Sequence, residues 1–290
     1  MSTALGDLLD LTVTDRAPDS SAIGYRGSIS AVFTIGPKVH GGSLQMMVAA
    51  AARRALSDLA EPDADPALLD GVSSLALASD YLAAPDPDEV DLAVRIVKRG
   101  RTVSLAHVEV TQRGRLMVSS TVTLGRLDTG EPHHRGATPV DDLPAEPVPG
   151  AVAIGDSPLG EVMHLAPALD LSLDPDWFPV LRGGTGEPAI RGWTRPRDAA
   201  AQPETMALDF PVLVCDISPP VVMNLGLFGW APTVQLTTYL RRVPEPGWLR
   251  FAATSTEVGR GMFAEDHVVV DAAGALVAQS RQLALIPARR

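Results

Sequence analysis

The sequence contains a single cysteine, Cys215. One cysteine excludes a disulfide within the chain, and it excludes zinc or iron–sulfur sites that need four thiolates. The six histidines are scattered, and none has the HExxH or HxxE spacing typical of a metal-binding helix. We therefore expect no metal site and no bound cofactor.

Positive charge is also scarce, because 24 lysines and arginines stand against 35 aspartates and glutamates, for a net charge of −11. This balance disfavours nucleic acid or an anionic membrane as the main partner, since both attract basic surfaces. The longest apolar run, Met46 to Ala52, is too short to span a bilayer. The first 14 residues carry no cation and do not resemble a signal peptide. We expect no membrane insertion and a cytoplasmic location.

The 290 residues are enough for about two domains of ordinary size. In the first half, residues 41–59 form a predicted helix that is apolar on nearly every side and should be buried. The alternation that follows predicts three antiparallel strands, at residues 90–98, 102–112 and 116–124.

The middle of the chain differs in composition, because prolines recur between acidic residues from 126 to about 185. This segment is predicted to be a connector. After it, residues 204–216 are predicted to form a helix shortened or kinked by Pro211. Five runs in the second half are predicted strands: 189–194, 233–242, 248–256, 263–270 and 275–286. We therefore divide the chain into an N-terminal unit (1–128), a linker (129–185) and a C-terminal unit (186–290).

The second half repeats the first at an offset of 160 residues. Four matches at one offset, within about 20 residues, favour duplication over chance. The matched pairs are Gly114 and Gly274, His107 and His267, Leu116 and Leu276, and Ser120 and Ser280.

A buried helix wrapped by an antiparallel sheet, present twice, is the double hot-dog arrangement. The segment Val39-His40-Gly41-Gly42-Ser43 resembles the start of the hot-dog helix in acyl-CoA thioesterases of the TesB (thioesterase II) type. Residues 213–216 resemble the segment with that family's catalytic aspartate, and residues 276–282 resemble its closing strand, which carries a catalytic glutamine. The resemblance implies an α+β fold with two antiparallel sheets, each wrapped around a long buried helix.

The resemblance also implies an enzyme that hydrolyses acyl-CoA thioesters to a carboxylic acid and CoA without a cofactor. The family uses an Asp, a Thr and a Gln that hold one water, and these positions fall on Asp216, Thr233 and Gln282. Thr237 and Thr238 are alternatives if the register slips. The substrate-binding residues that the resemblance implies are His40, Gly41 and Gly42. A homodimer or larger homo-oligomer is implied as well.

The chemistry of these residue types supports the assignment. An aspartate near the end of a buried helix is desolvated, which raises its pKa and makes it a stronger base once ionised. Threonine and glutamine form hydrogen bonds while neutral, so they position a water without competing for its proton. Backbone N–H groups at the start of the Gly41 helix, at its positive end, are candidates to stabilise the oxyanion.

The internal repeat predicts one composite site per chain. The position related to Gln282 in the first half is Val122, and a valine cannot orient water. One half would therefore supply the polar trio, and the other half the glycine helix start and the acyl groove.

Each candidate also has a structural interpretation. Asp216 could cap or terminate a helix, Thr233 could be an ordinary strand residue, and His40 could pack at the helix start. Cys215 is expected to be a buried small hydrophobe. Two other functions stay open: a non-catalytic acyl-CoA or acyl-carrier binding protein, and a hot-dog enoyl-CoA hydratase. The Asp, Asn-Pro, His segment of such hydratases is absent from the sequence.

Overall fold

The structure is a computed structural model that describes residues 3–17, 21–60 and 69–288. The first part of the chain includes α1 (Ala4–Leu8), β1 (Thr12–Arg16), β2 (Ala22–Ser28), β3 (Thr34–Ile35), β4 (Lys38–Val39), α2 (Gly41–Asp58), β5 (Val72–Tyr81), β6 (Glu89–Lys98), β7 (Val103–Gln112) and β8 (Arg115–Arg126). The rest forms β9 (Val152–Ala153), β10 (Leu169–Leu173), β11 (Ala189–Pro196), α3 (Met206–Val214), β12 (Thr233–Leu240), β13 (Leu249–Thr254), β14 (Met262–Val270) and β15 (Leu276–Leu285).

The predicted helices and strands are confirmed. The first predicted helix is α2, the three strands that follow the sequence alternation are β6, β7 and β8, and the second helix is α3 with Pro211 inside it. The five strands predicted in the second half are β11 to β15.

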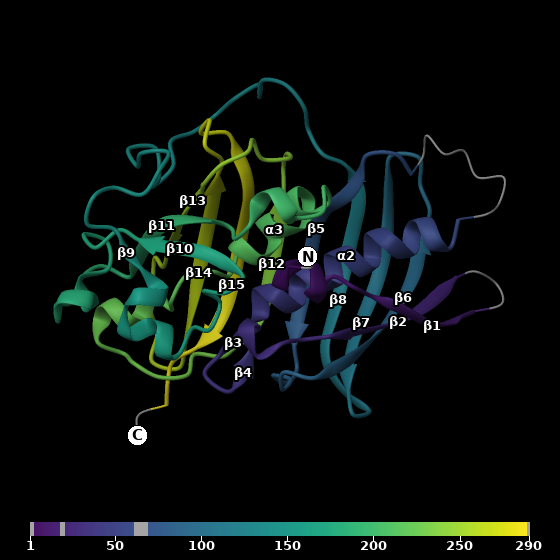
Figure 1. Ribbon diagram of the computed structural model, residues 1–290, viewed down its shortest axis with the longest axis horizontal. Helices are drawn as coiled ribbons and strands as arrows, with labels where there is room; N and C mark the ends of the chain where they lie inside the picture. Colours follow the sequence, from purple (N-terminus) through teal and green to yellow (C-terminus); the bar gives the residue numbers. More distant parts are fainter. Residues whose placement is uncertain (1–2, 18–20, 61–68, 289–290) are drawn as a thin grey trace.

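In the described residues, one large sheet of 13 strands runs through both halves of the chain, and β3 and β4 pair separately (Figure 1). The prediction of two separate sheets is therefore corrected: β5 and β12 pair antiparallel and join the halves. This pairing satisfies backbone groups that two isolated sheets would leave exposed at their edges. The expectation of two long helices is corrected too, because α3 has only nine residues while α2 has 18.

Strand order confirms the internal repeat. Outward from the joint, the first half runs β5-β8-β7-β6-β2 and the second half runs β12-β15-β14-β13-β11. The related glycines Gly114 and Gly274 both occupy hairpin turns with positive φ, 75° and 84°. The two halves are thus copies of one topology, related across the β5–β12 joint.

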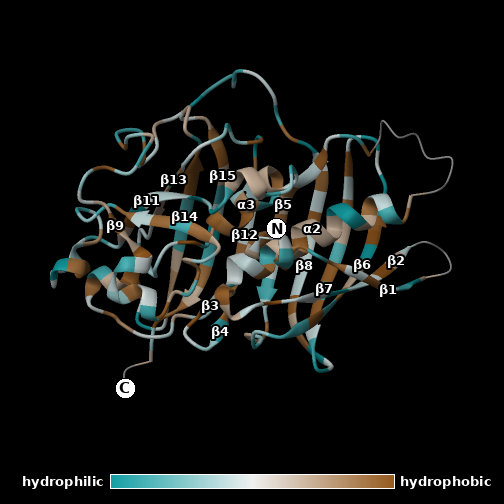
Figure 2. Ribbon diagram, in the orientation of Figure 1, coloured by the Kyte–Doolittle hydropathy of each residue, from teal (hydrophilic) through white to brown (hydrophobic). Residues whose placement is uncertain are grey.

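Helices α2 and α3 pack against each other on one face of the sheet, near the joint (Figure 1). Residues of α2 are buried along nearly its whole length, as the apolar run predicts, and α3 is strongly hydrophobic (Figure 2). Arg53 of α2 forms an ion pair with Asp209 of α3. The start of α2 faces the end of α3, and this contact positions the site described below.

A buried hydrogen-bond network ties α2 to the joint between the halves. The Gln45 side-chain amide donates to Ser79 Oγ of β5 (3.0 Å) and to the Leu236 carbonyl of β12 (3.1 Å). Thr238 Oγ1 donates to Gln45 Oε1 (2.7 Å). Every polar atom of the Gln45 side chain therefore has a partner, which makes its burial affordable.

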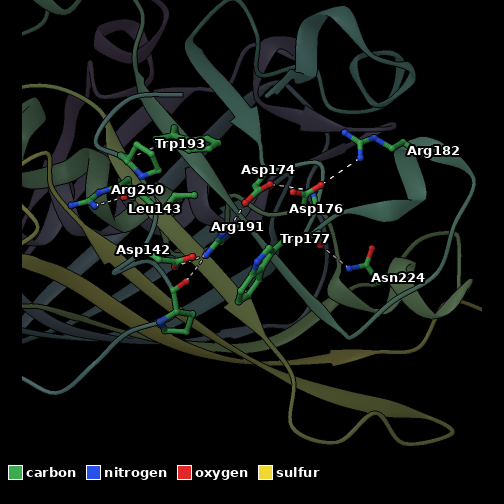
Figure 3. Close-up of polar contacts among 12 residues, drawn as sticks. Asp142, Leu143, Asp174, Asp176, Trp177, Arg182, Arg191, Trp193, Asn224 and Arg250 are labelled. Atoms are coloured by element: carbon green, nitrogen blue, oxygen red, sulfur yellow. Dashed lines mark hydrogen bonds and ion pairs between the residues drawn. The ribbon is translucent and has the colours of Figure 1, made fainter. Parts of the chain in front are cut away.

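The predicted linker is held against the second half of the sheet. β9 and β10 extend the sheet beyond β11. Arg191 of β11 donates to Asp174 (2.8 Å) and Asp142 (2.7 Å), and its guanidinium lies 4.4 Å from the centre of the Trp177 ring (Figure 3). The unit boundaries at residues 128 and 185 stay a prediction.

Across residues 3–17, 21–60 and 69–288, neither α2 nor any other helix combines the length and the apolar character needed to cross a membrane.

Candidate active site

A cavity of about 630 Å³ opens where the start of α2, the end of α3 and the strands β12, β14 and β15 converge. Its walls are mostly apolar, and they come from both halves and from the linker. The apolar lining includes Ile35, Val39, Leu44, Leu159, Met163, Met223, Trp230 and Val234. Its polar lining includes His40, Tyr81, Asp216, Ser218, Thr233, Glu265 and Gln282. The sequence predicts such a composite cavity, lined by residues of both repeats.

Asp216 follows the last turn of α3 and lies against the first turn of α2. Ser280 Oγ donates to the Cys215 carbonyl (2.7 Å) and so fixes this turn to β15. A Cβ placed on Gly41 would lie 2.7 Å from Asp216 Oδ2, and one on Gly42 would lie 2.6 Å from the Leu213 carbonyl oxygen. Gly42 is therefore required by the close approach of the α3 backbone, and Gly41 leaves room for the Asp216 carboxylate.

Burial raises the pKa of Asp216, while His40 and a hydrogen bond from the Gly42 N–H act in the opposite direction. The raised pKa is the direction predicted from the sequence. The carboxylate lies at the positive end of α2, so the helix dipole also favours its ionised form. Asp216 is thus a buried carboxyl whose pKa is raised by burial, with the Gly42 N–H and His40 favouring the ionised form.

His40 has both ring nitrogens engaged with the protein. Nδ1 accepts from the Ser43 N–H (3.2 Å), and Nε2 lies 2.7 Å from the Asp216 carbonyl oxygen. Because Nδ1 accepts, the ring proton is on Nε2, which donates to that carbonyl. Nε2 also lies 3.6 Å from Asp216 Oδ2. His40 caps α2 and links it to Asp216, in addition to lining the cavity.

Thr233 and Gln282 line the same cavity as Asp216. Thr233 is the first residue of β12 and is partly buried. Gln282 on β15 is 7% exposed, and its Oε1 has no hydrogen-bond partner. A buried acceptor without a donor is costly, so a ligand, a water or a protonated neighbouring side chain must supply one.

The alternative threonines lie elsewhere. Thr238 is fully buried and donates to Gln45, and neither Thr237 nor Thr238 lines the cavity. Gly41 lines the cavity, whereas Gly42 is buried behind it with its N–H on Asp216. Cys215 is fully buried, as predicted, and burial raises the pKa of its thiol to about 12.

Sequence reasoning missed four polar residues of this site: Ser218, Glu265, His267 and Tyr81. Glu265 and His267 of β14 are each 2% exposed, and Ser218 Oγ lies between them. Burial, with the Asp216 charge as the second cause, raises the pKa of Glu265 to about 8. The signal was present, because alternation along β14 puts residues 263, 265, 267 and 269 on its buried face.

Tyr81 closes one side of the site. Its hydroxyl donates to the Gly41 carbonyl (2.8 Å), and burial, followed by the Asp216 charge, raises its pKa well above the usual value. The tyrosine therefore stays neutral and acts as a fixed donor. Within the described residues, no three His, Cys, Asp or Glu side chains gather closely enough to hold a metal ion.

The chain matches two protein families along most of its length. Residues 29–125 match the acyl-CoA thioesterase N-terminal domain, and residues 140–286 match the acyl-CoA thioesterase C-terminal domain. An uncharacterized protein of Mycobacterium tuberculosis strain H37Rv is 39% identical over 282 residues, which cover 91% of each chain.

Two solved structures share the architecture. A protein from Thermobifida fusca YX, provisionally assigned as a thioesterase II, is 26% identical with a TM-score of 0.76, and the match covers 99% of this chain and 98% of that one. A protein of unknown function with a hot-dog fold from Alicyclobacillus acidocaldarius is 18% identical with a TM-score of 0.72, over 100% of both chains. The second likeness supports the hot-dog fold alone.

Proposed function

Because the chain belongs to the acyl-CoA thioesterase family and is a thioester hydrolase, we propose that it hydrolyses acyl-CoA thioesters with a water molecule activated by Asp216. Thr233 and Gln282 hold this water. The products are the free carboxylic acid and CoA.

One observation carries the proposal: Asp216, Thr233 and Gln282, which come from three different elements, line one largely apolar cavity. A carboxylate, a hydroxyl and an amide around one water supply a base and two neutral positioning groups. The apolar walls suit an acyl chain, because burial of apolar surface there is favourable. Two strands and the end of α3 thus supply a rigid frame for hydrolysis.

The reaction follows from the chemistry of the thioester. The water oxygen bonds to the carbonyl carbon while Asp216 takes a water proton, and the carbonyl oxygen becomes an oxyanion. The intermediate then collapses, the carbon–sulfur bond breaks, and the proton on Asp216 passes to the leaving thiolate. The raised pKa of Asp216 strengthens it as a base for the first step and keeps the proton available for the last.

The oxyanion needs a donor, and the hydrogen bonds of the first α2 turn narrow the choice. The Gly42 N–H is directed to Asp216, and the Ser43 N–H to His40 Nδ1. We therefore assign the role to the Gly41 N–H, which belongs to a cavity-lining residue at the positive end of the helix.

The test is Asp216→Asn, assayed by release of free thiol from a panel of acyl-CoA substrates. We expect kcat to fall by about 10²–10⁴, the usual worth of general-base assistance, with little change in KM. Asp176→Asn is the matched control, because Asp176 has a side chain that is 82% exposed. Wild-type kcat in Asp216→Asn would show that another group is the base. A wild-type protein that binds acyl-CoA but releases no thiol would favour a non-catalytic binding protein.

A further inference from the structure

A buried chain of three polar groups, His267, Ser218 and Glu265, lies beside Asp216. Ser218 Oγ donates to Glu265 Oε1 (3.1 Å) and lies 3.1 Å from His267 Nε2. A hydroxyl has one proton, so a serine that donates to Glu265 must accept from the histidine. His267 Nε2 therefore carries the ring proton, and the hydrogen bonds run in one direction, from His267 through Ser218 to Glu265.

Gln282 faces Glu265 from the neighbouring strand. Glu265 and Gln282 are directly opposite each other on β14 and β15, and both line the cavity. Side chains at such positions have Cβ atoms about 4.5–5.5 Å apart on one face of the sheet. Gln282 Oε1 is a buried acceptor without a donor. If the Glu265 carboxyl is protonated, it can donate a hydrogen bond to this oxygen from the facing strand.

The surroundings of Glu265 favour the protonated carboxyl at neutral pH. Burial and the Asp216 charge raise its pKa to about 8, although hydrogen bonds from Ser218 and the Val221 N–H oppose this. The other titratable groups are His40 and Tyr81, which line the same cavity as Glu265, and His267, which shares Ser218 with it. Burial lowers the pKa of His267 to about 3, so it is neutral, and Tyr81 is neutral as well.

We propose that Glu265 is a positioning residue, whose protonated carboxyl donates a hydrogen bond to Gln282 Oε1 and so directs the Gln282 N–H groups toward the reacting water and thioester. The proposal rests on the proposed function, in which Gln282 holds the water. Ionisation of Glu265 removes the donor, leaves Gln282 free to rotate, and adds a second negative charge beside Asp216.

The experiment is the pH profile of kcat between pH 6 and 10, corrected for non-enzymatic thioester hydrolysis. In the wild type, kcat falls above a pH near 8, and one unit higher it retains about a tenth of its plateau value. Glu265→Gln keeps a donor at every pH, so its kcat changes less than about twofold between pH 7 and 9. Glu265→Met has no donor, and its kcat is about tenfold lower throughout.

Two further variants make the result specific. Glu257→Gln, the same chemical change at an exposed residue, keeps the wild-type profile. Ser218→Ala removes a hydrogen bond that favours the ionised form, so it moves the alkaline fall to higher pH. An alkaline fall that is unchanged in both Glu265→Gln and Ser218→Ala overturns the proposal. If Glu265→Gln does not fold, Ser218→Ala decides: a shift of the alkaline fall in kcat to higher pH supports the proposal, and no shift or a shift to lower pH overturns it.

A second readout does not depend on turnover. The infrared difference spectrum of wild type minus Glu265→Gln at pH 7 should contain the C=O band of a protonated carboxylic acid, and this band should disappear near pH 8 to 9. Without the band, Glu265 is not the donor, whatever the activity. If the band is present but wild type releases no thiol, the proposed function fails while the protonation of Glu265 stands.

Discussion

At Gly42, the first turn of α2 lies close to the backbone of α3. A Cβ at this position would lie 2.6 Å from the Leu213 carbonyl oxygen, 2.9 Å from His40 Cε1 and 3.0 Å from Asp216 Cβ. The carbonyl oxygen is backbone and cannot rotate away, so the helices must separate to admit even one methyl group. The same movement displaces the carboxylate from the Gly42 N–H that helps to hold it.

We therefore expect Gly42→Ala to lower both stability and activity. Overpacking of this kind costs about 1–3 kcal/mol, and displacement of a catalytic carboxylate by about 1 Å costs roughly 10²-fold in rate. Urea unfolding and the thiol-release assay measure the two effects. Gly261→Ala is the control, because a Cβ there meets nothing within 4 Å. Wild-type kcat/KM in Gly42→Ala would mean that the helix contact does not set the position of Asp216.

The resemblance of short motifs to a known family predicted part of the site. Asp216, Thr233 and Gln282 came from short motifs, and all three line the cavity. Glu265 was missed because a charged residue in a strand usually faces solvent, although the alternation that puts Phe263 and Val269 on the same face of β14 signalled its burial. This face of β14 is unusual because it buries a carboxyl, Glu265, and a histidine, His267, side by side.

At the scale of elements, Arg191 holds the linker to β11. The side chain is 8% exposed and donates to Asp174, Asp142 and the Pro139 carbonyl (3.2 Å). It therefore fastens two separate stretches of the linker at once, as Figure 3 shows for Asp142 and Asp174. Asp174 is itself only 6% exposed, so loss of the guanidinium would leave a buried carboxylate without its counter-charge.

Arg191→Met should destabilise the protein by about 3–5 kcal/mol, the usual cost of removing one partner from a buried ion pair. The matched control is Arg195→Met on the same strand. The Arg195 side chain is 46% exposed and pairs with Asp170, and such surface pairs contribute about 0–1 kcal/mol. Urea unfolding midpoints compare the two variants. Equal midpoints would mean that the linker is held by its apolar contacts alone.

Elements with regular alternation were predictable, and others were not. β6 alternates buried and exposed residues along most of its length, β7 alternates buried and partly buried ones, and both were found from the sequence. β5 was missed, although it joins the two halves, because its sequence is rich in serine and alanine, which have weak strand preference. Its strand conformation is imposed by pairing with β8 on one side and β12 on the other.

At the scale of the whole molecule, the duplication is symmetric in topology but not in chemistry. Val122, the position that the repeat relates to Gln282, is fully buried in the core. Where the start of α2 meets the end of α3, Asp216 lies beside the cavity, and at the other end of the helix pair Arg53 meets Asp209. One end of the α2–α3 pair therefore contributes to the cavity, and the other end holds a structural ion pair.

Buried titratable groups also set how the stability of the whole molecule depends on pH. His267 has a folded pKa lowered to about 3, so the stability it contributes is present above its unfolded value of 6.5 and is lost as pH falls. Asp209 and Glu265 have folded pKa values raised to about 6 and about 8, so their contributions are lost as pH rises from their unfolded values toward those pH values. Below pH 6.5, the effect of His267 on stability opposes the effects of Asp209 and Glu265. Between pH 6.5 and 8, Glu265 makes the largest contribution to the pH dependence of stability.

We therefore expect the free energy of unfolding to fall as pH rises from 6.5 to 8, with a slope of up to about 1.4 kcal/mol per pH unit, the value for one proton. Glu265→Gln cannot release a proton, so its stability should be flat across this interval, whereas Glu257→Gln should follow the wild type. Urea titrations at four or five pH values measure the slope. A wild-type stability that is constant from pH 6.5 to 8 would mean that Glu265 is already ionised in the folded protein, because only a group whose protonation differs between the folded and unfolded chains can produce a slope.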